Sequence, residues 1–248
     1  MITLTGKNIL ITGASSGLGE ATAIKVSEVG GRCFLLGTNK DRLEKVQKQC
    51  VNSEYIQFDL TEKDYSPVWQ KAKTFGKFDG LVHCAGKKIT KPLAMYKDED
   101  FDLIFNTNVK SAFKLLNGYL KPSVSNTPNS VILVSSISAI EGFSANSIYS
   151  ASKGALISFT KSLSSEYGKK GYRFNCLAPG VMDTPMSKEL IESMKQVNND
   201  SIAGTESIGK PNDFAFVAVF LLSELSKLIQ CHTIKMNITK QNLKNNEE

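Results

Sequence analysis

The sequence predicts an α/β fold, in which a doubly wound, mostly parallel sheet of six to seven strands has helices on both faces. Short apolar runs alternate with amphipathic helical segments along the chain, which is the pattern of a parallel sheet buried on both sides. The 248 residues are 41% hydrophobic and are enough for one sizeable core. No internal repeat or Gly/Ser-rich linker divides them, so we expect a single domain over residues 1–238.

Hydrophobic periodicity places the individual elements. Strands are expected at 7–12, 32–36, 54–58, 78–83, 129–135 and 171–177, with a seventh near 232–236. Helices are expected at 17–29, 40–50, 63–75, 99–120, 148–168 and 211–224. The seventh strand has the weakest pattern, because Val, Ile and aromatic residues are scarce there. Residues 239–248 form a polar tail rich in Asn, Gln, Lys and Glu, which we expect to be disordered.

A glycine-rich turn, Thr-Gly-Ala-Ser-Ser-Gly-Leu-Gly at 12–19, joins the first strand to the first helix. Strand, glycine turn and helix in this order form the dinucleotide-binding unit of the Rossmann fold. Gly13 allows the tight turn, and Gly17 and Gly19 allow close approach of backbone to phosphate and of helix to sheet. The amide groups at the helix start are expected to hold a pyrophosphate. The alternative is a glycine turn without a ligand.

Tyr149 and Lys153 lie one turn apart on the same face of the helix predicted at 148–168. A free phenol titrates near ~10, and an ammonium beside it favours the phenolate. Such a pair suits acid–base chemistry near neutral pH. The alternative is a buried ring beside a solvated ammonium, and the spacing alone does not decide between them.

Together these motifs resemble those of the short-chain dehydrogenase/reductase (SDR) family, whose TGxxxGxG turn and YxxxK motif they match. Further matches follow in the family's order over roughly residues 5–225: Cys84-Ala85-Gly86, Asn108, Ser136 thirteen residues before Tyr149, and Pro179-Gly180 with Thr184. The resemblance implies a single-domain Rossmann fold. It also implies an NAD(P)-dependent oxidoreductase that interconverts a carbonyl and a secondary alcohol, with 3-oxoacyl-[acyl-carrier-protein] reductases as similar members.

The resemblance also implies roles for the matching residues. Tyr149 is the acid and base, Lys153 lowers its pKa and binds the nicotinamide ribose, and Ser136 donates to the developing oxyanion. Asn108 is implied to hold a water that relays protons to Lys153. The expected cofactor-binding residues are Gly13, Ser15, Ser16, Gly17, Leu18, Gly19, Thr38, Asp59, Leu60, Ala85, Gly86, Tyr149, Lys153, Pro179, Gly180, Val181 and Thr184. The structural alternatives are a strand-end cap for Ser136, a helix-surface amide for Asn108 and a helix N-cap for Asp59.

The end of the second strand bears on the choice of cofactor. Gly37 stands where an acidic residue would hold the ribose hydroxyls of NAD. Thr38 and Ser16 stand where relatives that prefer the phosphate often have basic residues. The missing acid favours NADP(H), and the missing bases leave NAD(H) open. Lys40 and Arg42 are candidates for the phosphate contact, with a solvated helix surface as the alternative.

Composition argues against several other classes. The net charge of +6 comes from scattered lysines, so we expect no nucleic-acid partner. The longest apolar run, 214–222, is too short for a bilayer, and we expect neither a membrane partner nor a signal peptide. His83 and His232 show no ligand spacing, so no metal site is expected. Five cysteines without a C-x-x-C pair indicate a reducing compartment, and we expect a cytoplasmic protein.

Two departures from the family pattern stand out. His83-Cys84 replaces the usual Asn-Asn, and the closing Asp-Gly-Gly is missing, so the seventh strand and any tetramer contact through it stay open. A homodimer or homotetramer is expected. Residues 181–208 have apolar side chains at roughly helical spacing and are expected to form a mobile lid.

The sequence leaves the substrate open beyond a small carbonyl or alcohol. A 3-oxoacyl-carrier-protein reductase and a sugar or polyol dehydrogenase are both candidates. Lys87, Lys88 and Lys91 cluster after the fourth strand and are candidates to attract an anionic substrate or an acidic carrier. A catalytically silent nucleotide-binding regulator is a further alternative, and the intact catalytic residues argue against it. A dehydratase or epimerase of the same fold would need a longer substrate domain.

Overall fold

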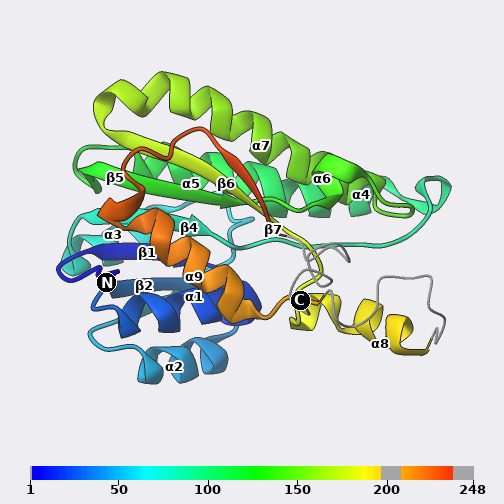
Figure 1. The fold of residues 1–248 in the computed structure, drawn as a ribbon, viewed down its shortest axis with the longest axis horizontal. Helices are drawn as coiled ribbons and strands as arrows, with labels where there is room; N and C mark the ends of the chain where they lie inside the picture. The colour runs from blue at the N-terminus through cyan, green and yellow to red at the C-terminus, as the bar shows by residue number, and fades with distance from the viewer. Residues whose placement is uncertain (1, 197–207, 237–248) are drawn as a thin grey trace, which may run out of the picture.

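The computed structural model describes residues 2–196 and 208–236. Its seven strands form one sheet in the order β3-β2-β1-β4-β5-β6-β7, and all neighbouring strands are parallel (Figure 1). The strands are β1 Asn8–Thr12, β2 Arg32–Gly37, β3 Glu54–Gln57, β4 Phe78–His83, β5 Ser125–Val134, β6 Tyr172–Pro179 and β7 Thr233–Met236. The predicted fold class is confirmed.

Helices connect the strands. They are α1 Gly17–Glu28, α2 Lys40–Gln49, α3 Ser66–Phe75, α4 Asp98–Phe105, α5 Ser111–Tyr119, α6 Ser138–Glu141, α7 Ser147–Tyr167, α8 Lys188–Gln196 and α9 Pro211–Leu222. A π-helical turn, η2 (Asn106–Lys110), joins α4 to α5. Short 3-10 turns are η1 Leu93–Met95, η3 Gly168–Lys170, η4 Pro185–Ser187 and η6 Glu224–Ser226.

The sheet separates two hydrophobic cores, because successive side chains of a strand point to opposite faces. In β1, Ile9 and Ile11 belong to one core and Leu10 to the other. Helices α1, α2 and α9 cover the first face, and α3, α5 and α7 cover the second (Figure 1). Both faces are therefore buried, which explains why the central strands read as continuous apolar runs.

The strand order reverses between β1 and β4. The chain runs outward from β1 to β3 and then returns to place β4 on the other side of β1. Parallel α/β sheets bind ligands in the crevice at the carboxyl ends of such strands. The glycine turn follows β1, and Ala85-Gly86 follows β4, so the fold brings these two motifs to the same crevice.

Two differences from the predicted elements are informative, and two expected segments lie wholly or partly outside the described residues. The helix expected over 99–120 is not continuous, because η2 interrupts it at Asn108. The strand expected at 129–135 begins at Ser125, which pairs with Phe78 ahead of a register shift. The expected lid is helical at α8, and its remainder from 197 to 207 lies outside the described residues, as does the tail at 239–248.

The seventh strand is present despite its weak pattern. Residues 233–236 pair in parallel with 176–179 of β6. The buried side chain of Asn175 supports this edge, since its Nδ2 donates to Ile229 O at 2.9 Å and its Oδ1 accepts from His232 N at 3.1 Å. A buried amide on β6 therefore fixes the entry to β7, where the sequence of β7 itself is uninformative.

Candidate active site

A cavity of about 400 Å³ lies in the crevice between the ends of β1 and β4. All the predicted cofactor-binding residues except Val181 line it, and so does Ser136. Asn108 lies behind the lining. The cavity wall also includes residues that were not predicted: Gly37, Phe58, Cys84, Lys87, Thr107, Val134, Ser135, Met182, Pro185, Met186 and Ser187.

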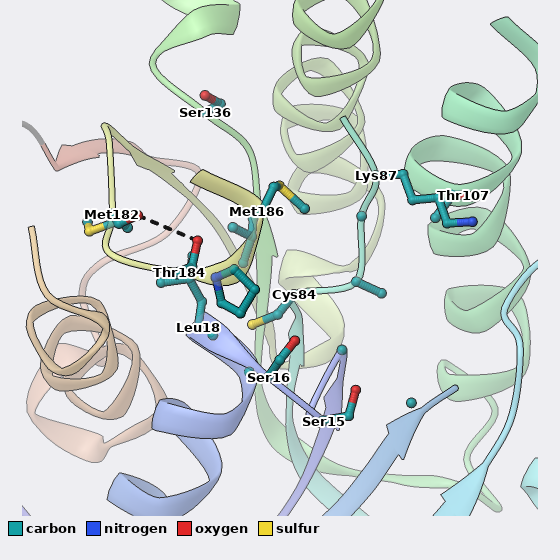
Figure 2. Close-up of a pocket in the computed structure, with 18 of the residues that line it drawn as sticks. Ser15, Ser16, Leu18, Cys84, Lys87, Thr107, Ser136, Met182, Thr184 and Met186 are labelled. Atoms are coloured by element: carbon teal, nitrogen blue, oxygen red, sulfur yellow. Dashed lines mark hydrogen bonds between the residues drawn. The ribbon is translucent and has the colours of Figure 1, made fainter. Parts of the chain in front are cut away.

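Figure 2 shows how separate segments meet around this cavity. Ser15, Ser16 and Leu18 lie on the glycine turn and the start of α1, and Thr184 and Met186 come from the segment after β6. The hydroxyl of Thr184 is 3.5 Å from the carbonyl of Met182 in the same segment. The apolar spacing at 181–208 was the sequence signal for these methionines.

The glycine turn packs against the end of β4 without space for side chains. Gly13 has φ +64°, and a Cβ added there would lie 2.9 Å from Ala85 N. A Cβ on Gly19 would lie 2.3 Å from Gly13 O, and one on Gly17 (φ +57°) would lie 3.2 Å from Thr184 Cγ2. Only glycine combines these conformations with such close approach. Bare backbone therefore forms this wall of the cavity.

Helix α1 begins directly at this wall. Its N-cap, Ser16, makes no side-chain capping hydrogen bond, so the first amide groups of the helix remain available to a ligand. Free amides and the positive end of a helix dipole suit an anion. The bare backbone and this helix start fit the pyrophosphate of a dinucleotide.

At the other end of the cavity, three functional side chains meet in a buried setting. Lys153 Nζ donates to Val134 O at 2.8 Å and lies 5.9 Å from the centroid of the Tyr149 ring. Burial lowers the pKa of Lys153 to about 8, and the neighbouring cysteines, Cys176 and Cys84, partly offset this. The lysine is therefore an ammonium that is easily deprotonated.

Burial also dominates the acidity of Tyr149, whose residue is 7% exposed. Burial raises its pKa, and a hydrogen bond with Ser136 partly counters this. The ammonium of Lys153 donates to Val134 O. The net shift is upward, and the expectation that Lys153 lowers the pKa of Tyr149 stays a prediction. The hydroxyl thus retains its proton at neutral pH.

Ser136 fits both interpretations of its position in the sequence, the catalytic one and the structural one. Its hydroxyl interacts with Tyr149 and also accepts a hydrogen bond from Ser138 N at 3.2 Å. It is therefore both a cap of the turn after β5 and a neighbour of the phenol. Ser135, by contrast, donates to Lys153 O at 2.8 Å and so braces α7 against the sheet.

Asn108 anchors the loop after β4 to α7. Its Oδ1 accepts from Lys87 N at 2.7 Å, and its Nδ2 donates to Lys87 O and to Ser152 Oγ, each at 2.9 Å. The residue is fully buried, so it is not a helix-surface amide. The π-helical turn directs it toward the loop, as π turns often do at functional sites. The proton relay through Asn108 stays a prediction.

His83 departs from the expected asparagine and takes part in a continuous chain of hydrogen bonds. Ala85 N donates to Thr12 Oγ1 at 3.2 Å, and Thr12 Oγ1 lies 2.9 Å from His83 Nδ1. On the other side, His83 Nε2 is 3.4 Å from Ser111 Oγ, which donates to Thr107 O. Burial lowers the pKa of His83 to about 3. A neutral ring fits this chain, because Nδ1 accepts from Thr12 while Nε2 donates to Ser111.

Asp59 is held in a turn and does not cap a helix. Its Oδ1 accepts from the amide and the hydroxyl of Thr61, each at 2.8 Å. This is an Asx turn, and it places the carboxylate beside Leu60 in the cavity wall. Both residues follow β3 and so lie on the side of the cavity away from Tyr149.

Two further findings bear on other classes of function. Within residues 2–196 and 208–236, no group of three or more His, Cys, Asp or Glu side chains is arranged to hold a metal ion. Of the helices that the structure describes, none combines the length and apolarity that crossing a membrane requires.

Known proteins resemble this chain over most of its length. The family model described as short chain dehydrogenase matches residues 7–195. A 3-oxoacyl-[acyl-carrier-protein] reductase of Rickettsia conorii is 35% identical over 240 residues, covering 96% of this chain and 98% of that protein. A protein of the same name from Thermotoga maritima is 30% identical over 233 residues, covering 91% and 94%. Among solved structures, a "Short-chain dehydrogenase/reductase SDR:Glucose/ribitol dehydrogenase" of Brucella melitensis has a TM-score of 0.85 at 28% identity, covering 95% and 96%.

Proposed function

The chain belongs to the short-chain dehydrogenase family and is an NAD(P)-dependent oxidoreductase, and on this premise we propose that it reduces the keto group of a 3-oxoacyl compound. The observation that supports this most strongly is the convergence of Tyr149, Ser136 and Lys153 on a cavity whose wall also includes the glycine turn and the start of α1. These two parts of the wall match the reacting and the phosphate-bearing parts of a nicotinamide dinucleotide complex.

The cofactor, when bound, supplies or accepts a hydride at the nicotinamide. The amide groups at the start of α1 would hold its pyrophosphate. In the reducing direction, the Tyr149 hydroxyl gives its proton to the substrate oxygen, and Ser136 donates a hydrogen bond to the same oxygen. The upward shift in the pKa of Tyr149 favours the protonated phenol that this step needs. The Lys153 ammonium stabilises the phenolate that results.

The 3-oxoacyl skeleton is carried over from the names of the Rickettsia and Thermotoga relatives. An acyl chain is also supported by Met186 on η4, an exposed apolar side chain of the cavity wall, and by exposed Leu190 on α8, the helix that follows η4. The second candidate is a sugar or polyol dehydrogenase, favoured by the name of the Brucella structure. A nucleotide-binding regulator without catalysis is less well supported, since the catalytic side chains converge.

A direct assay separates the two candidate reactions. We expect the purified protein to oxidise a nicotinamide cofactor in the presence of 3-oxobutanoyl-N-acetylcysteamine thioester or methyl 3-oxobutanoate, followed by the loss of absorbance at 340 nm. Ribitol and glucose with oxidised cofactor are the comparison substrates. Turnover confined to these polyols would favour the second candidate. A cofactor that binds while no substrate reacts would support the regulator.

We propose NADP(H) as the cofactor, with NAD(H) as the alternative. Gly37 at the end of β2 offers no carboxylate, and a Cβ there would already lie 3.1 Å from Ser15 Oγ. Thr38 is exposed and lines the cavity next to it. Lys40 is exposed, with Nζ 3.8 Å from Glu44 Oε1, and such a weak surface pair leaves it available to a phosphate.

Thr38→Asp is expected to weaken NADPH binding by about tenfold or more and NADH binding far less. A carboxylate at this position would repel the 2′-phosphate and could accept hydrogen bonds from the free ribose hydroxyls of NADH. Fluorescence titration of both reduced cofactors against the wild type and the variant measures the effect. Thr38→Asn is the matched control of similar size without charge. Equal losses for the two cofactors would place the phosphate elsewhere.

We also propose a cytoplasmic protein that acts as a homodimer or homotetramer. The cysteines of the described residues are free thiols, which supports a reducing compartment. Phe101 and Phe105 stack at 4.4 Å on α4, and Phe101 and Phe113 are partly exposed on neighbouring helices. Exposed aromatic groups of this kind support a subunit interface.

A further inference from the structure

Lys88 places a second ammonium group beside the proposed catalytic tyrosine. Its Nζ lies 5.6 Å from the centroid of the Tyr149 ring, as close as the Nζ of Lys153 at 5.9 Å. The side chain is partly buried, and among the described residues it has no hydrogen-bond or ion-pair partner. Burial lowers the pKa of Lys88, so the site disfavours its charge unless an anion joins it.

The loop that presents Lys88 is fixed on both sides. Asn108 binds the amide and the carbonyl of Lys87. The hydroxyl of Tyr96 donates to Ile89 O, and Lys91 N donates to Ala145 O at 2.9 Å. The backbone from which Lys88 extends is therefore held in place, which distinguishes it from a lysine on a free surface loop.

Positive charge exceeds negative charge at the end of the cavity where Tyr149 lies. Lys87 and Lys153 line the cavity, and Lys88 stands next to it. The only carboxylate among the described lining residues is that of Asp59, which is held by Thr61 at the opposite end. Lys91, in contrast, is neutralised by an ion pair with Asp100. Positive groups without a matching protein carboxylate attract an anionic substrate.

We propose that Lys88 is a specificity-determining residue that binds a carboxylate of the substrate, two carbon atoms from the reacting carbonyl. This inference deepens the proposed function and depends on it. The preferred substrate is a free oxo acid, which carries a negative charge at its carboxylate. A carrier-bound thioester has the same carbon skeleton but lacks this charge. The substrate's carbonyl oxygen would accept from the Tyr149 hydroxyl at about 2.7 Å, and Lys88 Nζ lies 5.6 Å from the centroid of the same ring, so one small substrate could contact both groups. A charge-assisted hydrogen bond is roughly twice as strong as a neutral one, so the acid is selected over its ester.

The test compares 3-oxobutanoate and 3-oxopentanoate with their methyl esters. We expect the wild type to have a higher kcat/KM for at least one acid than for its ester. Lys88→Met should lower that acid-to-ester ratio by about 10- to 100-fold, because it removes one charged hydrogen bond. Lys88→Arg keeps the charge and should retain most of the ratio. Lys97→Met removes an exposed lysine before α4 and should leave the ratio unchanged; melting temperatures verify that the variants fold.

Each outcome decides the proposal. An ester used as well as its acid by the wild type, or a ratio that Lys88→Met does not change, would overturn the role of Lys88 while the proposed reaction stands. If neither acids nor esters react, the proposed function fails for these substrates, and calorimetric titration with 3-oxobutanoate then decides on Lys88. Binding to the wild type that Lys88→Met weakens about tenfold or more supports it; absent or equal binding contradicts it.

Discussion

Tyr149→Phe is expected to lower kcat by about 10²- to 10⁴-fold, the contribution of a positioned acid or base, and to leave cofactor affinity almost unchanged. The ring stays in place and only the hydroxyl beside Ser136 is lost. Because burial raises the pKa of Tyr149, the wild-type reduction rate should fall only at alkaline pH, where the phenol loses its proton. The residual rate of the variant should lack this limb.

Tyr167→Phe is the matched control for this experiment. Tyr167 lies at the far end of the same helix, α7, and is not among the residues that line the cavity. Stopped-flow or steady-state rates of both variants, with the cofactor dissociation constant measured in parallel, separate chemistry from binding. A Tyr149→Phe protein that turns over at the wild-type rate would show that the proton comes from another group.

Gly19→Ala is expected to disrupt the glycine turn and with it cofactor binding. The added Cβ would lie 2.3 Å from Gly13 O, 2.7 Å from Gly13 C and 3.0 Å from Ala14 N. All three atoms belong to the backbone, so no flexible side chain moves aside, and α1 must shift away from the turn. Overpacking of this kind costs about 1–3 kcal/mol of stability. Urea unfolding and cofactor titration measure the two losses.

Gly154→Ala makes the same change at a position without a clash. A Cβ on Gly154 meets nothing within 4 Å, and the residue lies inside α7. Alanine is favoured over glycine in a helix by about 0.8–1.0 kcal/mol, so the free energy of unfolding should rise. If both variants were equally stable, close packing of the turn would not be the reason for glycine at position 19.

The sequence was most informative where a pattern is local. The buried strands, the glycine turn and the Tyr149–Lys153 spacing depend on neighbouring residues, and the family resemblance placed their partners in order. Nearly all the predicted cofactor-binding residues line one cavity. Val181 does not, although Gly180 and Met182 on either side of it do.

The sequence was least informative where a contact joins distant segments. Nothing local to 99–120 shows that Asn108 binds the backbone of Lys87, and this contact accompanies the π turn that a continuous helix lacks. Nothing local to β7 shows that Asn175 fixes the chain leading into it. The acidity of Tyr149 also depends on how deeply the fold buries the ring, because burial sets the direction of its pKa shift.

The hydrogen bonds between Asn108 and the loop after β4 have a consequence for the evolution of substrate preference. Both polar atoms of its side chain hold the main chain of Lys87, and they make no demand on the side chains at positions 87 and 88. Those two positions are therefore free to change without altering the path of the loop. Substitutions at positions 87 and 88 can therefore change substrate preference while Tyr149, Lys153 and Asn108 keep their positions.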